Sequence, residues 1–238
     1  MFDDKRWKLT LPIGEKNKPK EVYAPFKNVD KVFEVVDEGP TEGGSFKLTC
    51  PVDAVTTPGS SYGRTEFREL DAAGKLASWS NKEGLHAMRL TLSIDGIPHR
   101  KPQVVIAQIH DDKDDVFFIR FTGKSATSGL LEVVHDQKHY GKLDENLKLG
   151  EEFSCSITAT KKETVIIYVK DSTTTKVTLP KLKIRKGYFK AGNYIQSNTQ
   201  YDKTGESVVT LSSLELMDVP VGYMVGDDEL EFLMDICQ

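Results

Sequence analysis

The chain has 238 residues, of which 38% are hydrophobic and 29% are charged, as in an ordinary globular protein. No apolar run approaches the length of a membrane-spanning helix, and residues 1–6 lack the apolar core of a signal peptide. The net charge of −4 argues against a nucleic-acid partner, because no strong positive field attracts phosphates. We therefore expect a monomer with no membrane and no nucleic-acid partner, secreted if a leader has been removed and intracellular otherwise.

Short stretches with the two-residue alternation of β-strands follow one another along the chain. The first, Trp7 to Pro12, ends at a proline, and residues 13–28 are expected to form a surface loop. Further strands are predicted at residues 32–36, 45–51, 64–70, 85–94, 103–110, 116–121, 130–135, 152–160, 164–170, 175–179, 188–197 and 207–217. Many short strands with few convincing helices predict an all-β sandwich or barrel.

No linker rich in proline, glycine or serine divides the chain, so residues 1–220 are expected to form a single domain. The tail, residues 221–238, alternates acids with apolar residues, which indicates a short amphipathic helix or a frayed end without an assigned function.

Patterns that bind metals are weak in this sequence. Cys50, Cys155 and Cys237 have no metal-like spacing, so we interpret them as free thiols, with a Cys50–Cys155 disulfide as the alternative. His135 and His139 would share a helical face, but the residues around them are typical of a strand. We expect neither a metal nor an organic cofactor.

Residues 64–70, Arg-Thr-Glu-Phe-Arg-Glu-Leu, place Arg64, Glu66 and Arg68 on one face of a strand. A carboxylate between two guanidinium groups stays ionised. Glu66 is therefore expected to hold both arginines in place and to be a poor proton donor. The alternative is a surface ladder of ion pairs, which would be nearly neutral in energy.

Gln108 and His110 share a face at the end of the predicted strand 103–110, directly before the acidic loop 111–115. An amide donor beside an imidazole is a candidate catalytic pair, because histidine titrates near neutral pH. Taken alone, a single histidine at such a position is more often structural or merely exposed.

Residues 188–196, Tyr-Phe-Lys-Ala-Gly-Asn-Tyr-Ile-Gln, have one polar, aromatic and cationic face. That face carries Tyr188, Lys190, Tyr194 and Gln196. Gly192 lies among them and is interpreted as leaving space for a ligand. On the opposite, apolar face Asn193 is the one discordant residue. The alternative is a solvent-facing strand without function.

Other chemistries lack their motifs, since the chain has no Gly-x-Ser-x-Gly elbow, phosphate-binding glycine loop or paired cysteines. A glycoside hydrolase needs two available carboxylates. Glu66 is expected to be committed to arginines, and Glu69 is predicted to lie on the opposite face of its strand.

The three motifs, in this order, together with the opening Trp-Lys-Leu-Thr-Leu-Pro, resemble the alginate lyases of polysaccharide lyase family seven. The resemblance spans most of the chain. It implies a β-jelly roll of two antiparallel sheets, whose concave sheet forms a groove for a uronic-acid polymer such as alginate. Two departures stand out. Phe67 replaces the usual leucine, and Asn193 and Ile195 stand where valine and asparagine are common, so the groove or the polymer recognised is expected to differ.

A lyase removes the proton on C5 of a uronate and releases the oxygen on C4. Arg64 and Gln108 suit neutralisation of the adjacent carboxylate. We expect His110 or Tyr194 to take the C5 proton, depending on the sugar configuration, and Tyr194 to protonate O4; the resemblance implies the same roles. The residues expected to bind substrate are Glu66, Arg68, Tyr188, Lys190 and Gln196.

Two alternatives are considered beside an alginate lyase. One is a lyase that acts on another polyuronate, such as glucuronan, by the same elimination. The other is a noncatalytic carbohydrate-binding jelly roll, which would not need His110 and Tyr194 together. In the family, the sequence Gln-Ile-His often accompanies cleavage of guluronate-containing or mixed blocks, although Ile109 is predicted to point into the core.

Overall fold

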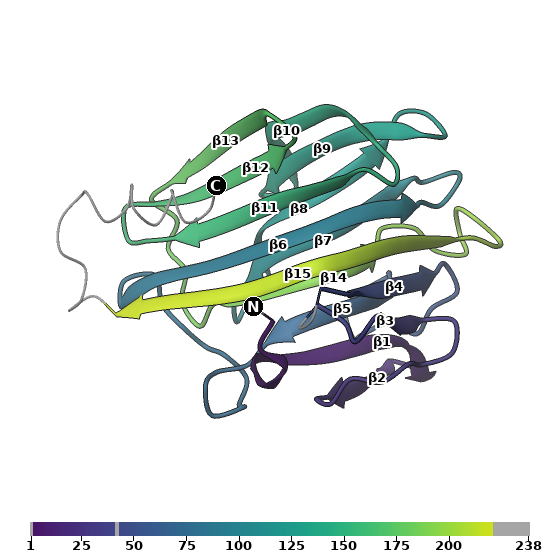
Figure 1. Cartoon of the computed structure of the whole chain (residues 1–238), viewed down its shortest axis with the longest axis horizontal. Helices are drawn as coiled ribbons and strands as arrows, with labels where there is room; N and C mark the ends of the chain where they lie inside the picture. Colours follow the sequence, from purple (N-terminus) through teal and green to yellow (C-terminus); the bar gives the residue numbers. More distant parts are fainter. Residues whose placement is uncertain (1, 41–42, 221–238) are drawn as a thin grey trace.

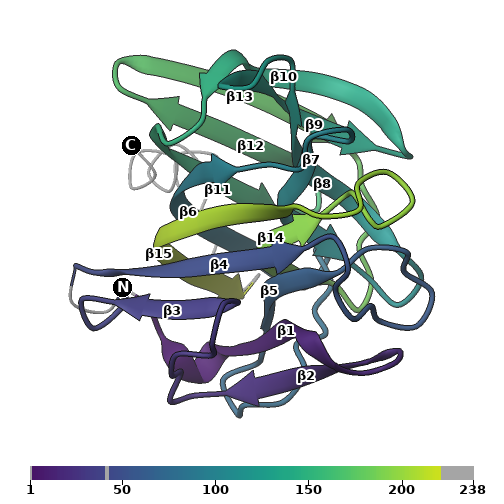
Figure 2. The same ribbon diagram turned by 90° about the vertical axis from the view of Figure 1, so that its right-hand side faces the viewer.

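The computed structural model describes residues 2–40 and 43–220, which fold as two antiparallel β-sheets packed face to face (Figures 1 and 2). This architecture confirms the predicted all-β sandwich. The predictions for the tail, including Cys237, fall outside the described residues.

The eight-stranded sheet runs, in spatial order, β10 (Lys138–Lys148), β9 (Ser128–His135), β8 (Asp115–Gly123), β7 (Gln103–His110), β14 (Tyr188–Ile195), β5 (Arg64–Glu69), β1 (Trp7–Glu15) and β2 (Lys18–Tyr23). The seven-stranded sheet runs β13 (Thr173–Pro180), β12 (Glu163–Lys170), β11 (Glu152–Ala159), β6 (Gly84–Gly96), β15 (Glu206–Pro220), β4 (Ser45–Pro51) and β3 (Phe33–Val36). All three sequence motifs therefore lie on adjacent strands of one sheet, in the order β7, β14 and β5.

One apolar core fills the space between the sheets, because alternate side chains of each strand point inward. At one end of it, Phe67 packs in a cluster of aromatic rings, with its ring centroid 5.2 Å from that of Phe26 and 5.5 Å from that of Phe46. Phe67 is fully buried. The departure from leucine at this position therefore enlarges a core contact and does not reach the groove, contrary to the expectation from the sequence.

Two strands escaped the sequence prediction, and both are at edges of the eight-stranded sheet. Of the predicted loop at residues 13–28, residues 13–23 are in fact the end of β1 and the whole of β2, joined by a tight turn at Lys16 and Asn17. β10 follows a turn in which Asp136 and Gln137 both have positive φ. Edge strands tolerate proline and exposed polar side chains, so the alternation that marks a strand is weak in them.

Asn193, the discordant residue of the third motif, joins the two sheets. Its Nδ2 donates to the carbonyl oxygens of Leu48 and Ser207, both at 2.8 Å, and its Oδ1 accepts from Ser207 Oγ at 2.5 Å. Asn193 and Ser207 are both fully buried. A buried amide with all of these partners fixes β14 against β4 and β15 of the opposite sheet.

Gly192 is required by the backbone of β14 and does not open space for a ligand, which corrects the interpretation from the sequence. Its φ is +135°, and the pairing of β14 with β7 shifts register between Ala191 and Tyr194. A Cβ added at Gly192 would lie 2.8 Å from the carbonyl oxygen of Thr65 and 3.1 Å from Leu48. Only glycine fits the backbone conformation and the close approach of β5 at this position.

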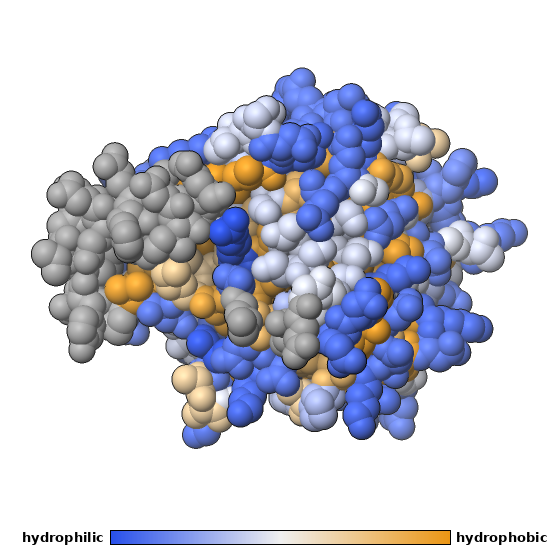
Figure 3. Space-filling model, in the orientation of Figure 1, coloured by the Kyte–Doolittle hydropathy of each residue, from blue (hydrophilic) through white to orange (hydrophobic). Residues whose placement is uncertain are grey.

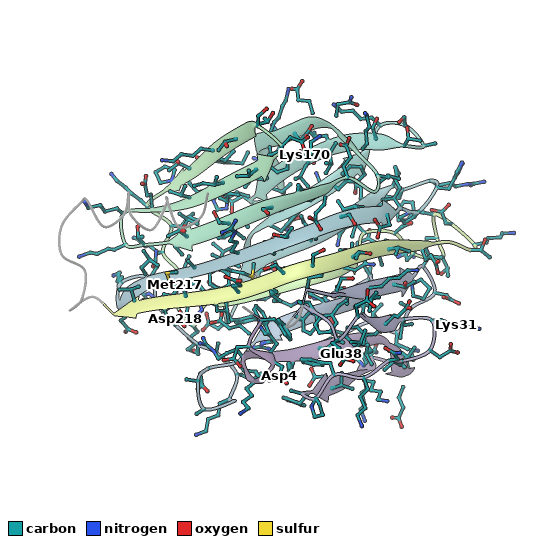
Figure 4. The ribbon with its side chains drawn as sticks, in the orientation of Figure 1. Asp4, Lys31, Glu38, Lys170, Met217 and Asp218 are labelled. Carbon is teal, nitrogen blue, oxygen red and sulfur yellow. The ribbon has the colours of Figure 1, made fainter. Side chains whose placement is uncertain are left out.

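One end of the sandwich is tied by charged groups around the N-terminal 3-10 helix η1 (Asp4–Arg6). Asp218, near the end of β15 (Figure 4), accepts from Arg6 Nη2 at 2.8 Å, and its other oxygen lies 2.8 Å from His86 Nδ1. The side chain of Glu69 accepts from Trp79 Nε1 and from the backbone N–H of Phe189, both at 2.8 Å. Glu69 is therefore engaged behind the sheet, as its position in the strand predicted.

The structure shows which partners Cys50, Cys155, His135 and His139 have. Cys50 and Cys155 are buried free thiols, so they form no disulfide with each other. His135 Nδ1 lies 2.8 Å from the carbonyl oxygen of Val116, and His139 Nδ1 lies 2.7 Å from Glu132. Residues 2–40 and 43–220 contain no group of three or more His, Cys, Asp or Glu side chains placed to hold a metal ion.

The outer face of the seven-stranded sheet, where it is visible in Figure 3, carries mostly hydrophilic and intermediate side chains. None of the helices in the described part of the chain has the length and hydrophobicity of a membrane span.

The Asn193–Ser207 contact predicts a coupled loss of stability. Asn193→Val, which introduces the family's common residue, should lower the free energy of unfolding by about 1–3 kcal/mol, because Ser207 loses its buried partner. Ser207→Ala in addition should recover part of the loss, as residues in contact are not additive. Urea unfolding of the two single variants and the double variant measures this coupling, and strictly additive losses would contradict it.

Candidate active site

The three motifs line one cavity of about 520 Å³ on the eight-stranded sheet. Its floor comes from β1, β5, β7 and β14. Its rim comes from Glu21 of β2, the loop residues 57–60, and residues 113–115, which lead into β8. A larger hollow of about 710 Å³ lies on the seven-stranded sheet, between β3, β4, β6 and β15. No residue of the three motifs lines that larger hollow, so the chemistry belongs to the smaller cavity.

Strand register sets the cationic floor of the cavity. Lys8 of β1 pairs with Arg68 of β5, Arg68 pairs with Lys190 of β14, and Lys190 pairs with Gln108 of β7. Directly paired residues on one face lie side by side. The result is a row of three cations and an amide that crosses four strands, and all four side chains line the cavity.

Glu66 is the centre of the hydrogen bonding below this floor. Its Oε2 accepts from Arg64 Nη1 at 3.2 Å and lies 2.5 Å from Lys190 Nζ, while its Oε1 accepts from Gln108 Nε2 at 2.6 Å. Only 1% of Glu66 is exposed. The carboxylate can only accept, so the amide nitrogen of Gln108 must face it, and the second N–H of that nitrogen remains available.

Opposing effects set the charges of this cluster. Burial alone would raise the pKa of Glu66, but the charges of Lys190 and Arg64 outweigh burial and hold that pKa below its usual value. Burial lowers the pKa of Lys190 to about 8, although the Glu66 carboxylate opposes the shift. At neutral pH the cluster therefore holds one negative and two positive charges, leaving a net positive field for an anionic ligand.

The sequence predicted that Glu66 would hold both arginines, and this is wrong for Arg68. Arg68 instead lies over the ring of Tyr188, with Cζ 3.8 Å from the ring centroid. Lys190 and Gln108 take the place expected for Arg68 around Glu66. The sequence could not reveal this, because the partners depend on which strands become neighbours.

His110 has a defined tautomer in this environment. Its Nδ1 lies 2.7 Å from the carbonyl oxygen of Asp111, which can only accept, so Nδ1 carries the proton. The neutral ring therefore has a free lone pair on Nε2. Burial lowers the pKa of His110, the charge of Lys190 lowers it further, and the hydrogen bond to Asp111 only partly opposes them. These are the properties of a general base.

Tyr188 connects the base to the cationic row. The rings of His110 and Tyr188 are nearly parallel, with centroids 5.3 Å apart and an interplanar angle of 16°. Since Tyr188 lies on the strand between those of His110 and Arg68, its ring is supported from both neighbouring strands. Burial raises the pKa of Tyr188, so this phenol keeps its proton at neutral pH.

Tyr194 lies on the other side of the Glu66 cluster. Arg64 packs over its ring, with Cζ 3.9 Å from the ring centroid, and its hydroxyl lies 3.1 Å from Ser60 Oγ. Tyr194 pairs with Arg64 across β14 and β5, which explains the stacking. The phenol thus faces the cavity beside a fixed guanidinium group.

Sequence reasoning missed several residues that line the cavity. Lys8 is buried and donates to Glu21 Oε1 at 2.6 Å, and Ser60 comes from the loop before β5. Asp115 belongs to the rim, where burial and the adjacent Asp114 raise its pKa to about 6. Lys8 lies in the predicted first strand, yet only the pairing of β1 with β5 reveals its place beside Arg68.

Some predicted residues lie outside the cavity. Gln196 follows the end of β14, and its Nε2 lies 3.5 Å from the carbonyl oxygen of Tyr194. Glu66 lies below the floor and does not line the cavity. Asn193 and Ile195, like Phe67, are buried on the core side of the sheet, so neither departure from the family pattern contacts the groove.

The fold and the cavity together define a class of protein, a β-sandwich whose cationic groove is lined by a histidine and a tyrosine and suits an anionic ligand. Comparison with known proteins agrees with this class. The family described as alginate lyase matches residues 2–218. Curated proteins give no significant match.

Solved structures add independent likenesses. Alginate lyase AlgAT5 from polysaccharide lyase family 7 is 32% identical, with a TM-score of 0.79 over 90% of this chain and 95% of that chain. The alginate lyase from Corynebacterium sp. is 30% identical, with a TM-score of 0.77 and the same coverage of 90% and 95%. The alginate lyase from Klebsiella pneumoniae is 18% identical with a TM-score of 0.78 over 92% and 97%, a likeness of fold alone.

The chain therefore belongs to the alginate lyase family. It is a β-jelly-roll polysaccharide lyase that cleaves alginate. The family membership favours this function over a noncatalytic binding module and over a lyase of another polyuronate.

The Glu66 cluster predicts a large penalty for removing one charge. Glu66→Gln should lower the free energy of unfolding by about 3–5 kcal/mol, because Lys190 and Arg64 would be left as buried, unpaired cations. Glu151→Gln, which removes the half-buried partner of Lys170 at 2.9 Å, is the control for a pair nearer the surface and should cost less than about 1 kcal/mol. Urea unfolding compares the two variants, and equal small losses would show that Glu66 does not organise the floor.

Proposed function

We propose that Arg64, Gln108, His110 and Tyr194 carry out β-elimination on alginate, and that Arg68, Tyr188 and Lys190 bind the neighbouring sugars. Glu66 acts in substrate binding only by holding its three partners. The observation that carries the proposal is that all of these side chains except Glu66 line one cavity of about 520 Å³. Gln196, outside the cavity, is left with no direct role in this proposal.

Charge is the main obstacle to the reaction. Removal of the C5 proton builds negative charge next to a carboxylate that is already ionised. Arg64 and the free N–H of Gln108 donate to that carboxylate in a partly dry site, where one preorganised donor contributes about 3–4 kcal/mol. Because Glu66 fixes both donors before the sugar arrives, little reorganisation accompanies the reaction.

The two proton transfers of the reaction use side chains on two sides of the cavity. His110 Nε2 or the Tyr194 oxygen takes the proton from C5, according to the configuration of the sugar. The electron pair of the C5–H bond forms the C4–C5 double bond, the C4–O4 bond breaks, and Tyr194 gives a proton to O4. The geometry supports this division, because His110 and Tyr194 flank the Glu66 cluster on different rows of the sheet.

The protein is proposed to act as a monomer outside the cell. A polymeric substrate does not cross a membrane, which supports action outside the cell. Size-exclusion chromatography with light scattering tests the monomer, and a dimer that completes the groove would overturn it.

Tyr194→Phe tests the catalytic assignment. The variant should lose at least about 10²- to 10⁴-fold in turnover, as expected for a lost general acid, and should bind alginate within about twofold of the wild type. Turnover is followed by the ultraviolet absorbance of the new double bond. The control is Tyr140→Phe on β10, a 42%-exposed tyrosine remote from the motifs. Near-normal turnover in Tyr194→Phe would remove Tyr194 from the mechanism.

The pH profile of kcat/KM should have two limbs. His110 must be neutral to act as a base, and its lowered pKa places the acid limb below the ordinary histidine value of about 6.5. Lys190 must be charged to attract the polymer, so kcat/KM should fall as pH rises through about 8. Lys190→Met should lower kcat/KM and abolish the limb near pH 8. A limb that persists unchanged in this variant would show that Lys190 does not cause it.

A further inference from the structure

Ser60, in the loop between β4 and β5, contacts two of the four proposed catalytic side chains. Its Oγ lies 3.1 Å from the Tyr194 hydroxyl and accepts from Arg64 Nη2 at 3.4 Å. The same oxygen donates to the carbonyl oxygen of Tyr62 at 2.9 Å and accepts from the backbone N–H of Tyr62 at 3.2 Å. Ser60 lines the cavity and is therefore part of its wall.

A proton count assigns the direction of these bonds. A serine hydroxyl has one proton, and the carbonyl of Tyr62 can only accept, so the Ser60 proton points to Tyr62. The oxygen of Ser60 is then an acceptor toward Tyr194, and the phenolic proton lies between the two hydroxyls. In the route in which His110 takes the C5 proton, Tyr194 carries its own proton at the start, and this contact gives the Tyr194 O–H a defined direction.

The same hydroxyl can reverse its role. If Tyr194 loses its proton, its oxygen becomes a better acceptor than a neutral carbonyl, because bonds to charged acceptors are about twice as strong. Rotation about the Cβ–Oγ bond then moves the Ser60 proton from Tyr62 to the phenolate. Arg64, which touches both Ser60 and the Tyr194 ring, supplies positive charge to the same place.

We propose that Ser60 is a positioning residue for proton transfer by Tyr194. It accepts from the phenol before the proton moves to O4 of the leaving sugar, and it donates to the phenolate afterwards. No proton leaves Ser60 in this sequence, so the balance is unchanged: Tyr194 gives its proton to O4, the C4–O4 bond breaks, and Ser60 only turns. The inference rests on the proposed role of Tyr194.

A purely structural role does not require these contacts. The turn that contains Ser60 is already closed by the backbone bond from Ser60 N–H to the carbonyl oxygen of Thr57 at 3.1 Å, and Gly59 supplies its positive φ of 80°. The adjacent Ser61 is exposed, and its backbone carbonyl, not its side chain, accepts from Asn198. Ser61 is thus a matched serine in the same loop that does not touch Tyr194.

Steady-state kinetics on alginate with Ser60→Ala, Ser60→Thr and Ser61→Ala tests the proposal. Ser60→Ala should lower kcat about 10- to 100-fold, the equivalent of one lost hydrogen bond to a charged group, while KM stays within about twofold. Ser60→Thr keeps the hydroxyl and should recover kcat to within about threefold of the wild type. Ser61→Ala should match the wild type, and thermal unfolding should show all three variants folded.

The outcomes separate this inference from the proposed function. An active wild type with an equally active Ser60→Ala variant would overturn the role of Ser60 and leave the role of Tyr194 intact. A fall in kcat that Ser60→Thr does not reverse, or a rise in KM alone, would also overturn it, since either indicates a structural effect on the loop. A wild type inactive on alginate and on other polyuronates would overturn both.

Discussion

A single buried carboxylate organises the side chains that line the cavity. Glu66 is surrounded by Arg64, Lys190 and Gln108, which come from three adjacent strands, and it has almost no contact with solvent. Burying a charge is costly unless it is paired and hydrogen-bonded, so each of the three donors is held in place by the same requirement. The three donors cannot leave these positions without leaving the Glu66 carboxylate buried and without hydrogen bonds. The cavity is in this sense preorganised for a ligand carboxylate.

The sandwich supplies the precision that this arrangement needs. Register between β1, β5, β14 and β7 aligns the cationic row, and Asn193 fastens β14 to the opposite sheet directly behind it. The departures from the family pattern fall on this hidden side. Phe67, Asn193 and Ile195 change how the sheet is packed and anchored, while the side chains that line the cavity keep the family's motifs. Ile109 is also fully buried, so any effect of this position on block preference must pass through the core.

Sequence alone predicted much of this because period-two alternation is enforced wherever one face of a strand is buried. Within each strand, alternation assigned Arg64, Arg68, Gln108, His110, Tyr188, Lys190 and Tyr194 to one face. The family resemblance implied that these faces share a groove, and all seven residues line the cavity. The sequence did not predict features that depend on weak local patterns or on contacts between distant segments of the chain. The edge strands β2 and β10 lack a clear apolar face, the partners of Glu66 depend on strand order, and Ser60 reaches Tyr194 only because a loop folds over the sheet.

The most direct test of the central claim is a crystal structure of the Tyr194→Phe variant with a bound alginate oligosaccharide. We expect one uronate carboxylate within about 3.2 Å of both Arg64 and Gln108, with C5 or O4 of that sugar directed at His110 or at the ring of residue 194. A carboxylate held instead by Lys8 and Arg68, with C5 remote from both groups, would contradict it.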